Sequence, residues 1–540
     1  MFPNVNQEIR NGKESQINKC ISVFAEASLV DKAVEALSLF LPRCEFKAGD
    51  NEADVLALWR ESLTSPEAYT LTVKCGRAVI EYNSYLGLRN AIATFSLLVK
   101  ERDGAVVVPD VEINDCPVLS HRGVMLDIAR GTVPLGQLLD DMVLIAKSRH
   151  NILHLHLADA KGVAVEMDSF PEEYRIPDYY TKAQVSEIVR LADVLGLEII
   201  PEIDMPAHST RLNTVLPELK CDTDARPQCL WTVCAGEERV YELYRKVLLE
   251  IAQMFPTGRY LHIGGDELEF SDLPTERRRV CHWHECRKCK KKMEEEGIRD
   301  RQELYYYFIN RINGYVKECG KQTVMWSDQI DCTRPAALST DILMQFWRVA
   351  AHGRGPHDGC SMQGQLDLGY KMINSFYWNT YLDEEHYMNS RNLSSWRWDE
   401  IPETTESVKH QIVGSEVCAW EYGNREMFKH YDYSLPSAIV LAGDKFWCGL
   451  KKPYDTDTAL DLTKAVLGAA VPDGFNPFEA VGDILPPRLD EPSYVANVTL
   501  VKGKIQEIID TLSDASLYTA GDKTRAEIYK KCIEYTLDKK

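Results

Sequence analysis

Short apolar runs alternate with amphipathic segments through the middle of the chain, from about residue 123 to residue 418. Runs of four to eight apolar residues bounded by turn signals are typical of strands buried on both faces of a parallel sheet. Eight such runs follow one another: Gly123–Asp127, Asn151–Leu157, Leu197–Ile203, Tyr260–Ile263, Thr323–Trp326, Asp341–Phe346, Lys371–Phe376 and Gln411–Cys418. Eight successive β/α units predict an α/β fold, the (β/α)8 TIM barrel.

The segment between the second and third predicted strands carries clear helix signals. Thr181 is a candidate N-cap and Gly196 a candidate stop. Apolar side chains recur between them at helical spacing, at Val185, Ile188, Val189, Ala192 and Leu195. This spacing predicts a helix that packs one face on the barrel.

The pattern changes on both sides of the barrel. Before it, strands are predicted at Cys20–Phe24, Tyr69–Val73 and Ala78–Tyr82, and helices at Leu29–Leu41 and Leu86–Val99. Residues 1–112 are therefore expected to form a small α+β domain, with Pro109–Pro117 as a linker and the barrel over 118–452. Helical patterns at Leu462–Ala470 and Val495–Leu512 predict a helical C-terminal extension over residues 453–540.

Composition and charge narrow the classes of partner. Hydrophobic residues make up 45% of the chain and charged residues 27%, which is the balance of a globular protein. The formal net charge of -20 repels nucleic-acid phosphates and anionic lipids. No run reaches the 18 or so apolar residues of a membrane-spanning helix. We therefore expect neither nucleic acid nor membrane as a partner, and a homo-oligomer is left open.

Cysteine usage and the N-terminus point to a reducing compartment. The first 19 residues are polar and lack the apolar run of a secretory signal. The 16 cysteines lack the regular spacing of a disulfide scaffold. We expect reduced thiols and a cytoplasmic protein, although a signal removed before this N-terminus would leave the same sequence.

Candidate chemistry gathers where the predicted strands end, which is where barrel enzymes build their sites. Carboxylates accept protons from sugar hydroxyls, and aromatic rings cover the C–H face of a pyranose. Both kinds of residue follow the second to eighth strands: Asp159, Asp204, His208, Asp266, Glu267, Trp326, Trp347, Tyr381, Asp383, Trp420 and Glu421. Any one of them could be structural, but their convergence on one barrel face predicts a sugar site.

The adjacent carboxyl groups of Asp266 and Glu267 are the strongest catalytic candidates. Cleavage of a glycosidic bond requires a carboxylic acid that protonates the leaving oxygen. Two glycines, Gly264 and Gly265, precede the pair and permit close approach of the backbone. Neighbouring side chains at a strand end diverge, so the two carboxyl groups are expected to have different roles.

Four motifs, in this order, resemble glycoside hydrolase family 20, the β-N-acetylhexosaminidases: HRGVMLDIAR from His121, HLHLADA from His154, PEIDMPAHS from Pro201 and HIGGDE from His262. The resemblance runs from about residue 65 to 450. It includes YNSYLGLRNAIATFSLLV from Tyr82, which is similar to the end of the small domain before the barrel in this family. It implies an exo-acting retaining enzyme that removes terminal β-linked GlcNAc or GalNAc from a glycan or oligosaccharide.

The resemblance also implies substrate-assisted catalysis. Glu267 would be the general acid and later the base, and Asp266 would orient the 2-acetamido group of the substrate, whose oxygen attacks C1 to give an oxazolinium. Tyr381 would donate a hydrogen bond to that oxygen. The other substrate-binding residues that the resemblance implies are Arg122, Asp159, His208, Trp326, Trp347, Asp383, Trp420 and Glu421.

The sequence departs from the family pattern at two places. Asp159 is followed by Ala160, where the family often has a second acidic residue. The last loop, CAWEYGN, is one residue shorter than usual, so Glu421 is the weakest match. Two alternatives stay open: a relative similar to lacto-N-biosidases that releases a disaccharide, and a barrel that binds amino sugars without cleaving them.

A separate segment, CHWHECRKCKKK, contains Cys281, Cys286 and Cys289. Thiolates and imidazoles are ligands that zinc prefers, and the CxxC spacing fits a metal knuckle. No second CxxC pair follows, so a reduced structural cluster explains the segment equally well. The mechanism that the resemblance implies needs no Lewis acid, and we expect no cofactor and no catalytic metal.

Overall fold

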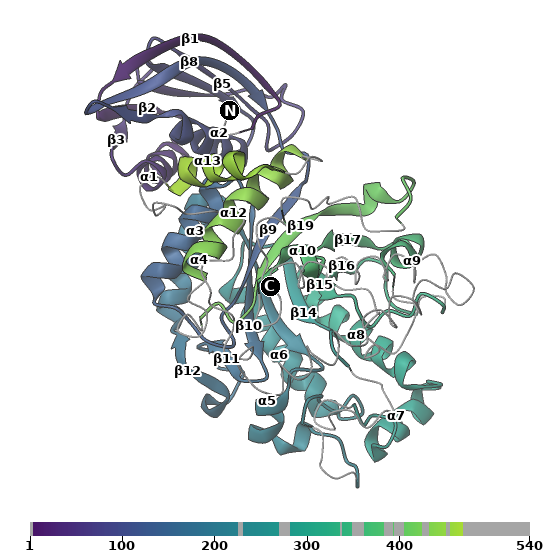
Figure 1. Ribbon diagram of the computed structural model, residues 1–540. Coiled ribbons are helices and arrows are strands. Elements are labelled where there is room, and N and C mark those ends of the chain that lie inside the picture. The colour runs from purple at the N-terminus through teal and green to yellow at the C-terminus, as the bar shows by residue number, and fades with distance from the viewer. Residues whose placement is uncertain are drawn as a thin grey trace, which may run out of the picture.

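The fold is taken from a computed structural model that describes residues 4–224, 230–268, 281–334, 337–347, 361–382, 393, 404–423, 431–449 and 454–467. An N-terminal domain with a mixed β-sheet sits beside a larger α/β barrel (Figure 1). Helices α1 (Val30–Phe40) and α2 (Tyr85–Leu98) lie between the sheet and the barrel helices α3 (Leu135–Lys147) and α4 (Lys182–Leu195). Almost every residue of α2 is buried, because its neighbours cover it on all sides.

The N-terminal sheet has the strand order β1-β8-β5-β6-β4-β2-β3, and β7 pairs with β8. Its strands are β1 (Gln7–Ile17), β2 (Cys20–Phe24), β3 (Glu45–Ala48), β4 (Val55–Trp59), β5 (Tyr69–Lys74), β6 (Arg77–Tyr82), β7 (Lys100–Arg102) and β8 (Ala105–Asp115). The predicted strands and helices of this domain are confirmed as β2, β5, β6, α1 and α2. The sequence pattern did not predict β1, β3, β4, β7 or β8.

The predicted linker Pro109–Pro117 is wrong, because β8 runs through most of it. Pro109 has no N–H to donate to a ladder, but it lies beside a shift in register of β1 between Arg10 and Glu14. The irregularity therefore accommodates the proline within a paired strand. This sheet ends at Asp115 and the first barrel strand begins at His121, while the limits of the three predicted domains stay predictions.

Eight parallel strands form the barrel, and pairing between β19 and β9 closes it. They are β9 (His121–Asp127), β10 (Ile152–Asp159), β13 (Glu198–Met205), β14 (Tyr260–Gly264), β15 (Gln322–Trp326), β16 (Leu343–Phe346), β17 (Lys371–Asn374) and β19 (Ile412–Ala419). All eight predicted strands are confirmed, with ends that differ by no more than two residues. The fold is a TIM barrel, as the alternation of apolar runs predicts.

Helices and short strands connect the barrel strands. The predicted helix before β13 is confirmed as α4, with a capping box at Thr181 and a left-handed stop at Gly196. The remaining elements are β11 (Gly162–Val165), β12 (Arg175–Tyr180), α5 (Thr210–Val215), α6 (Glu238–Met254), α7 (Arg287–Glu296), α8 (Arg301–Glu318), α9 (Met362–Asp367), α10 (Tyr377–Thr380) and β18 (Tyr381–Leu382), with 3-10 turns at Glu172–Tyr174, Pro217–Leu219 and Lys409–Gln411.

Among the described residues, two helices follow the barrel strands. Helix α12 (Tyr431–Cys448), which packs on α3 and β19, was not predicted from the sequence pattern. Helix α13 (Thr456–Leu467) overlaps the predicted helix Leu462–Ala470. Figure 1 shows α13 running back towards the N-terminal domain. The predicted helix Val495–Leu512 and most of the predicted C-terminal extension lie outside the described residues.

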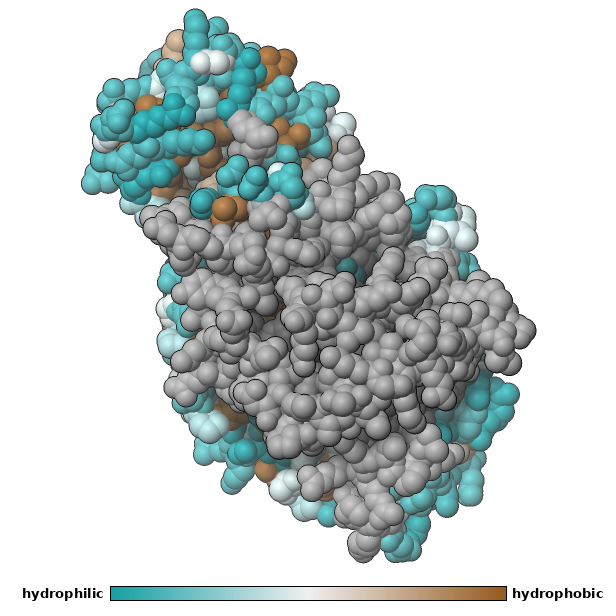
Figure 2. All heavy atoms as spheres, viewed as in Figure 1, coloured by the Kyte–Doolittle hydropathy of each residue, from teal (hydrophilic) through white to brown (hydrophobic). Residues whose placement is uncertain are grey.

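Within the described ranges, every helix is too short or too polar to cross a bilayer. In the view of Figure 2, the N-terminal domain presents mainly hydrophilic residues, with apolar ones scattered among them.

The interior of the barrel holds histidines and carboxylates as well as apolar side chains. Glu416 on β19 lies 2.5 Å from His121 Nε2 and 2.9 Å from His154 Nδ1. The other ring nitrogen of His154 lies 3.1 Å from Glu202 on β13. Burial disfavours the charged form of His154, but Glu416 and Glu202 more than offset this and raise its pKa to about 9. A protonated His154 therefore joins two buried carboxylates across the barrel.

This pairing predicts that stability falls as the pH rises. The pKa of His154 in the folded protein exceeds the value of about 6.5 for an unfolded chain, so the stabilisation is complete below pH 6.5 and is lost as the pH approaches 9. Urea titrations should give a free energy of unfolding that declines from pH 6.5 to 8.5, and declines less steeply in His154→Gln. Equal slopes in the two proteins would contradict the assignment.

Candidate active site

Strand β14 delivers the two catalytic candidates to the C-terminal end of the barrel. Gly264 and Gly265 have φ values of +69° and +100°, and Asp266 and Glu267 follow them. A Cβ atom on Gly264 would lie 1.8 Å from Oδ1 of Asp204, so only glycine allows this close approach to the end of β13. The close backbone approach expected of the two glycines is thus present, towards Asp204, directly before Asp266 and Glu267, which we call the acid pair.

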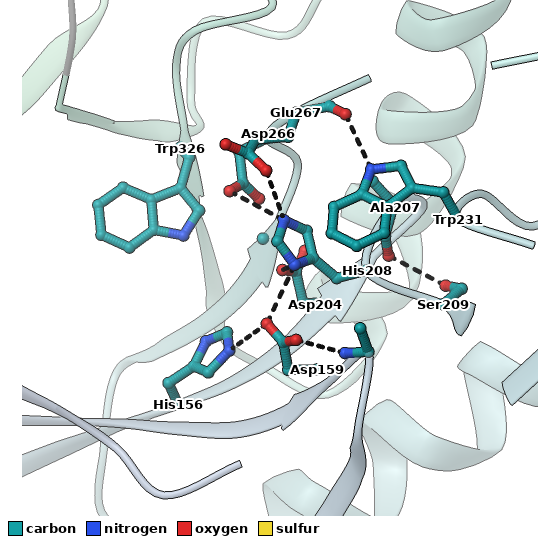
Figure 3. A network of polar contacts seen from close by, with 12 residues as sticks. His156, Asp159, Asp204, Ala207, His208, Ser209, Trp231, Asp266, Glu267 and Trp326 are labelled. Atoms are coloured by element: carbon teal, nitrogen blue, oxygen red, sulfur yellow. Dashed lines mark hydrogen bonds and ion pairs between the residues drawn. The ribbon is translucent and has the colours of Figure 1, made fainter. Parts of the chain in front are cut away.

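His208, from the loop after β13, lies between four carboxylates (Figure 3). Its Nε2 is 3.4 Å from Asp266 and 3.5 Å from Glu267, and its Nδ1 is 3.0 Å from Asp159 and 3.7 Å from Asp204. Burial opposes its charged form, but Asp204, Asp159 and Asp266 raise the pKa of His208 well above its usual value. The imidazolium therefore links the second, third and fourth strands at the acid pair.

Asp204, the last of these four carboxyl groups, has a shifted pKa of its own. Burial and the neighbouring Asp266 raise the pKa of Asp204 well above its usual value. The raised pKa reflects like-charge repulsion between Asp204 and Asp266, and the imidazolium of His208, 3.7 Å from Asp204, offsets part of this repulsion.

Arg130, just after the first strand, organises the other side of the site. Its guanidinium lies 2.7 Å from Asp127, 2.8 Å from Asp159 and 3.7 Å from Glu421, and it stands over the ring of Trp420 at 5.1 Å. The charge of Arg130 also holds the pKa of Asp159 well below its usual range, although burial acts in the other direction. One cation thus orders carboxylates from three strands at one edge of the site.

The assignment of Arg122 as a substrate-binding residue is wrong. Arg122 is fully buried near the start of β9, at the opposite end of the barrel from Asp266. Its guanidinium donates to both carboxylate oxygens of Glu67 and to the carbonyl oxygens of Leu119 and Arg149. Arg122 therefore joins the N-terminal domain to the barrel.

Four predicted aromatic residues meet beside the acid pair. Trp326, from the end of β15, lies 6.5 Å from Tyr381 and 5.8 Å from Trp420 between ring centres. Trp347 stacks on Tyr381 at 5.9 Å with an angle of 5° between the rings. The four rings come from the ends of different strands, as expected for a wall that covers an apolar ligand face.

Two predicted residues remain, Glu421 and Asp383. Glu421 lies at the same edge of the site as Arg130, and its backbone N–H donates to Asp127 at 2.9 Å. Asp383 lies outside the described residues.

A tryptophan that the sequence pattern did not predict positions the catalytic candidates. Trp231 donates its indole N–H to the carbonyl oxygen of Glu267 at 3.0 Å, and its ring lies 4.2 Å from that of His208 (Figure 3). It stands far along the loop after β13, where no strand end marks it. Asp127 and Arg130 did carry a usable signal, since they occupy the end of a predicted strand.

Within the described part of the chain, Asp266 Oδ1 is buried without a hydrogen-bond partner, as is Oδ1 of the neighbouring Asp204. Among the described residues, no donor is in hydrogen-bonding position to Asp266 Oδ1, while Oδ2 faces His208. A buried carboxylate oxygen left unpaired is costly, so this atom is placed to accept a hydrogen bond from a bound ligand.

The comparisons with known proteins agree with this geometry. The sequence matches the family described as "Glycosyl hydrolase family 20, catalytic domain" over residues 119–443, which is more than half of the chain. The chain belongs to glycosyl hydrolase family 20.

Relatives in family 20 are distant in sequence. A β-hexosaminidase of Porphyromonas gingivalis is 26% identical over 397 residues, which cover 67% of this chain and 47% of that protein. The β-hexosaminidase subunit alpha of Rattus norvegicus is 26% identical over 376 residues, which cover 66% of each chain. The match thus spans between about half and two thirds of these two relatives.

Solved structures of family 20 share the fold. The exo β-N-acetylglucosaminidase of Vibrio harveyi, solved in complex with N-acetylglucosamine, is 21% identical with a TM-score of 0.71, covering 86% of this chain and 76% of that one. The β-N-acetylhexosaminidase of Bacteroides fragilis gives the same identity and TM-score and covers 86% of this chain and 94% of its own.

Two kinds of side-chain cluster in this family 20 chain could hold a metal. Three buried groups combine histidine with carboxylates: His154 with Glu202 and His262, His156 with Asp159 and Asp204, and His208 with Asp204 and Asp266. Within each of these groups, a histidine already forms an ion pair with a carboxylate. A fourth group consists of Cys221, Cys234, Cys286 and Cys289. Of the three predicted cysteine candidates, Cys281 lies outside this group.

The contact between Glu67 and Arg122 predicts strong energetic coupling. Removing either partner leaves a buried charge unpaired, so Glu67→Leu and Arg122→Met should each lower the free energy of unfolding by about 3–5 kcal/mol. The double variant should cost clearly less than the sum of the two, measured by urea titration. Glu67→Leu combined with Arg130→Met is the control and should be additive; additivity of both pairs would refute the contact.

Proposed function

We propose that this protein is an exo-acting retaining β-N-acetylhexosaminidase that removes terminal β-linked GlcNAc or GalNAc from a glycan or oligosaccharide. The observation that carries the proposal is the unpaired, buried Oδ1 of Asp266 next to the carboxyl group of Glu267. Membership of family 20 and the exo-acting Vibrio harveyi relative support it.

In the first step, the acetamido N–H of the substrate donates to Asp266 and the acetamido oxygen attacks C1. The C1–O bond to the aglycone breaks as the new C1–O bond forms, and Glu267 protonates the departing oxygen. Because the attacking oxygen is part of the substrate, orientation replaces a bimolecular encounter. The Asp266 carboxylate also stabilises the positive charge that develops on the oxazolinium.

In the second step, Glu267 takes a proton from a water molecule that attacks C1. The bond between C1 and the acetamido oxygen breaks, its electron pair returns to the acetamido group, and the sugar leaves with retained configuration. The Trp326, Trp347 and Trp420 rings line the acetamido side and limit access of competing water before this step. Tyr381 belongs to the same cluster, and its proposed role is to donate a hydrogen bond to the acetamido oxygen.

The sugar hydroxyls are bound at the opposite edge, by Arg130 and Asp159 with Glu421. Their ion pairs form a preassembled set of donors and acceptors from the first, second and eighth strands. His208 touches Asp159 as well as the acid pair, so it couples hydroxyl binding to the position of the catalytic carboxyl groups.

A cytoplasmic location is part of the proposal. None of the 13 cysteines that the structure describes forms a disulfide bond, which suits a reducing compartment. Fractionation of the source cells, followed by detection of the protein, would test the location directly.

The acid pair can be tested with aryl β-glycosides of GlcNAc, GalNAc and glucose. We expect the two acetamido sugars alone to be cleaved, and both Glu267→Gln and Asp266→Asn to lower kcat by about 10²–10⁴-fold. Asp31→Asn, a change at an exposed helical carboxylate of the N-terminal domain, is the matched control.

Three outcomes are informative. Cleavage of the glucoside at a comparable rate would refute substrate assistance, and sugar binding without any turnover would favour a non-catalytic barrel. Release of a disaccharide from a longer glycan, with no cleavage of the aryl monosaccharides, would favour the disaccharide-releasing alternative.

A second prediction separates the two arginines of the first motif. Arg130→Met should lower kcat/KM for the acetamido glycoside by about 10- to 100-fold, because charge-assisted hydrogen bonds to the sugar edge are lost. Arg122→Lys keeps the buried charge and should leave kcat/KM of the folded enzyme unchanged. A loss of kcat/KM in Arg122→Lys with normal stability would restore a direct role for Arg122.

A further inference from the structure

Four cysteine side chains from two loops of the barrel meet at one point. Cys221 and Cys234 belong to the loop between β13 and α6, whereas Cys286 and Cys289 stand at the start of α7, after β14. Their sulfur atoms all lie within 4.8 Å of one another, and all four residues are buried. Only tertiary folding brings the pairs together, since Cys234 and Cys286 are 52 positions apart.

The spacing of the sulfur atoms fits a shared metal ion. Cys234 Sγ lies 3.6 Å from the sulfur atoms of both Cys286 and Cys289. A tetrahedral zinc ion with Zn–S bonds of about 2.3 Å holds its sulfur ligands about 3.8 Å apart. The observed separations match the edges of such a tetrahedron.

The surroundings suit thiolates. The backbone N–H of Asp222 donates to Cys286 Sγ at 3.3 Å, and hydrogen bonds of this kind orient and stabilise metal-bound sulfur. Cys286 is the N-cap of α7 and Cys289 lies in its first turn, where the helix dipole favours negative charge. These features are independent of the sulfur spacing.

Close backbone packing fixes the two halves of the cluster. A Cβ atom on Gly236 would lie 2.3 Å from the carbonyl carbon of Lys288, so the chain after Cys234 fits against the start of α7 only with glycine at this position. Lys288 is also paired with Glu237, and Arg287 with Asp222. Both sides of the cluster are thus held before any ion binds.

We propose that Cys221, Cys234, Cys286 and Cys289 bind one structural zinc ion that ties the loop after β13 to the loop after β14. A zinc site of four cysteines is closed to substrate, so the ion has no part in bond cleavage. Its role is positional. The indole N–H of Trp283 donates to the carbonyl of Val233, next to Cys234, and Trp231 nearby holds the carbonyl of Glu267.

Metal analysis of the full-length protein is the first test. After purification without a metal-affinity step, elemental analysis should give about one zinc per chain. X-ray absorption at the zinc edge should show four sulfur neighbours at about 2.3 Å and no nitrogen or oxygen. Protein that stays free of zinc after refolding with a zinc salt, or a mixed sulfur and nitrogen shell, would overturn the proposal.

Matched cysteine variants provide the second test. Cys234→Ser should lose the zinc, whereas Cys281→Ser, in the same segment, and Cys44→Ser, a buried thiol of the N-terminal domain, should retain it. If Cys234→Ser does not fold, cobalt(II) bound to the wild-type chain gives an independent readout through its thiolate charge-transfer absorption. Absence of that absorption, or zinc retained in folded Cys234→Ser, would refute these ligands.

The positional role has its own readout. Protein refolded with a chelator should melt at a temperature several degrees lower than the zinc-bound form, and zinc, but not magnesium, should restore it. Identical melting temperatures with and without bound zinc would refute the bracing of the two loops. This measurement does not involve glycosidase activity, so its outcome is separate from that of the proposed function.

Discussion

One buried carboxylate, Glu202, sets the geometry on which the site depends. Its two oxygens lie within 2.5–3.1 Å of ring nitrogens of His154, His156, His262 and Trp326. Burial opposes its ionised form, but His156 and His262 hold the pKa of Glu202 well below its usual range. A buried charge is tolerated only with such partners, so each ring must keep its orientation. The indole of Trp326, a wall of the site, is fixed in this way.

The same carboxylate connects the barrel interior to the acid pair. His156 contacts Glu202 through Nδ1 and Asp159 through Nε2, and Asp159 in turn contacts His208. His208 then reaches Asp266, so an unbroken series of ion pairs runs from the middle of the barrel to its C-terminal end. The position of each side chain in this series, and therefore its partners, depends on the strand or strand end that carries it. The catalytic geometry is therefore a property of the closed barrel more than of any single loop.

Sequence patterns predicted the features that depend on the local order of residues. They missed the features that depend on the direction of a strand or on contacts between distant segments. The eight strands were predictable because apolar runs define them, and the strand ends identified most of the site. Arg122 and Arg130 belong to one motif, but Arg122 lies near the start of β9 and Arg130 follows its C-terminal end. Only Arg130 therefore reaches the site. Trp231 could not be predicted, because its role depends on a contact between two loops. Cys221 and Cys234 were missed for the same reason, since neither is close in sequence to the CxxC pair.

Backbone strain shows why those loop contacts matter. Among the described residues, three of the six non-glycine residues with positive φ are His208, Glu267 and Glu421, all in the site. Such conformations cost about 1–3 kcal/mol and persist only where neighbouring groups determine them. For Glu267, with φ of +52°, Asp328 accepts from the backbone N–H and Trp231 donates to the carbonyl. The backbone of Glu267, the proposed general acid, is thus held from two sides. A change that loosens the loop after β13 would therefore act on the proposed catalysis through Glu267 without touching the substrate.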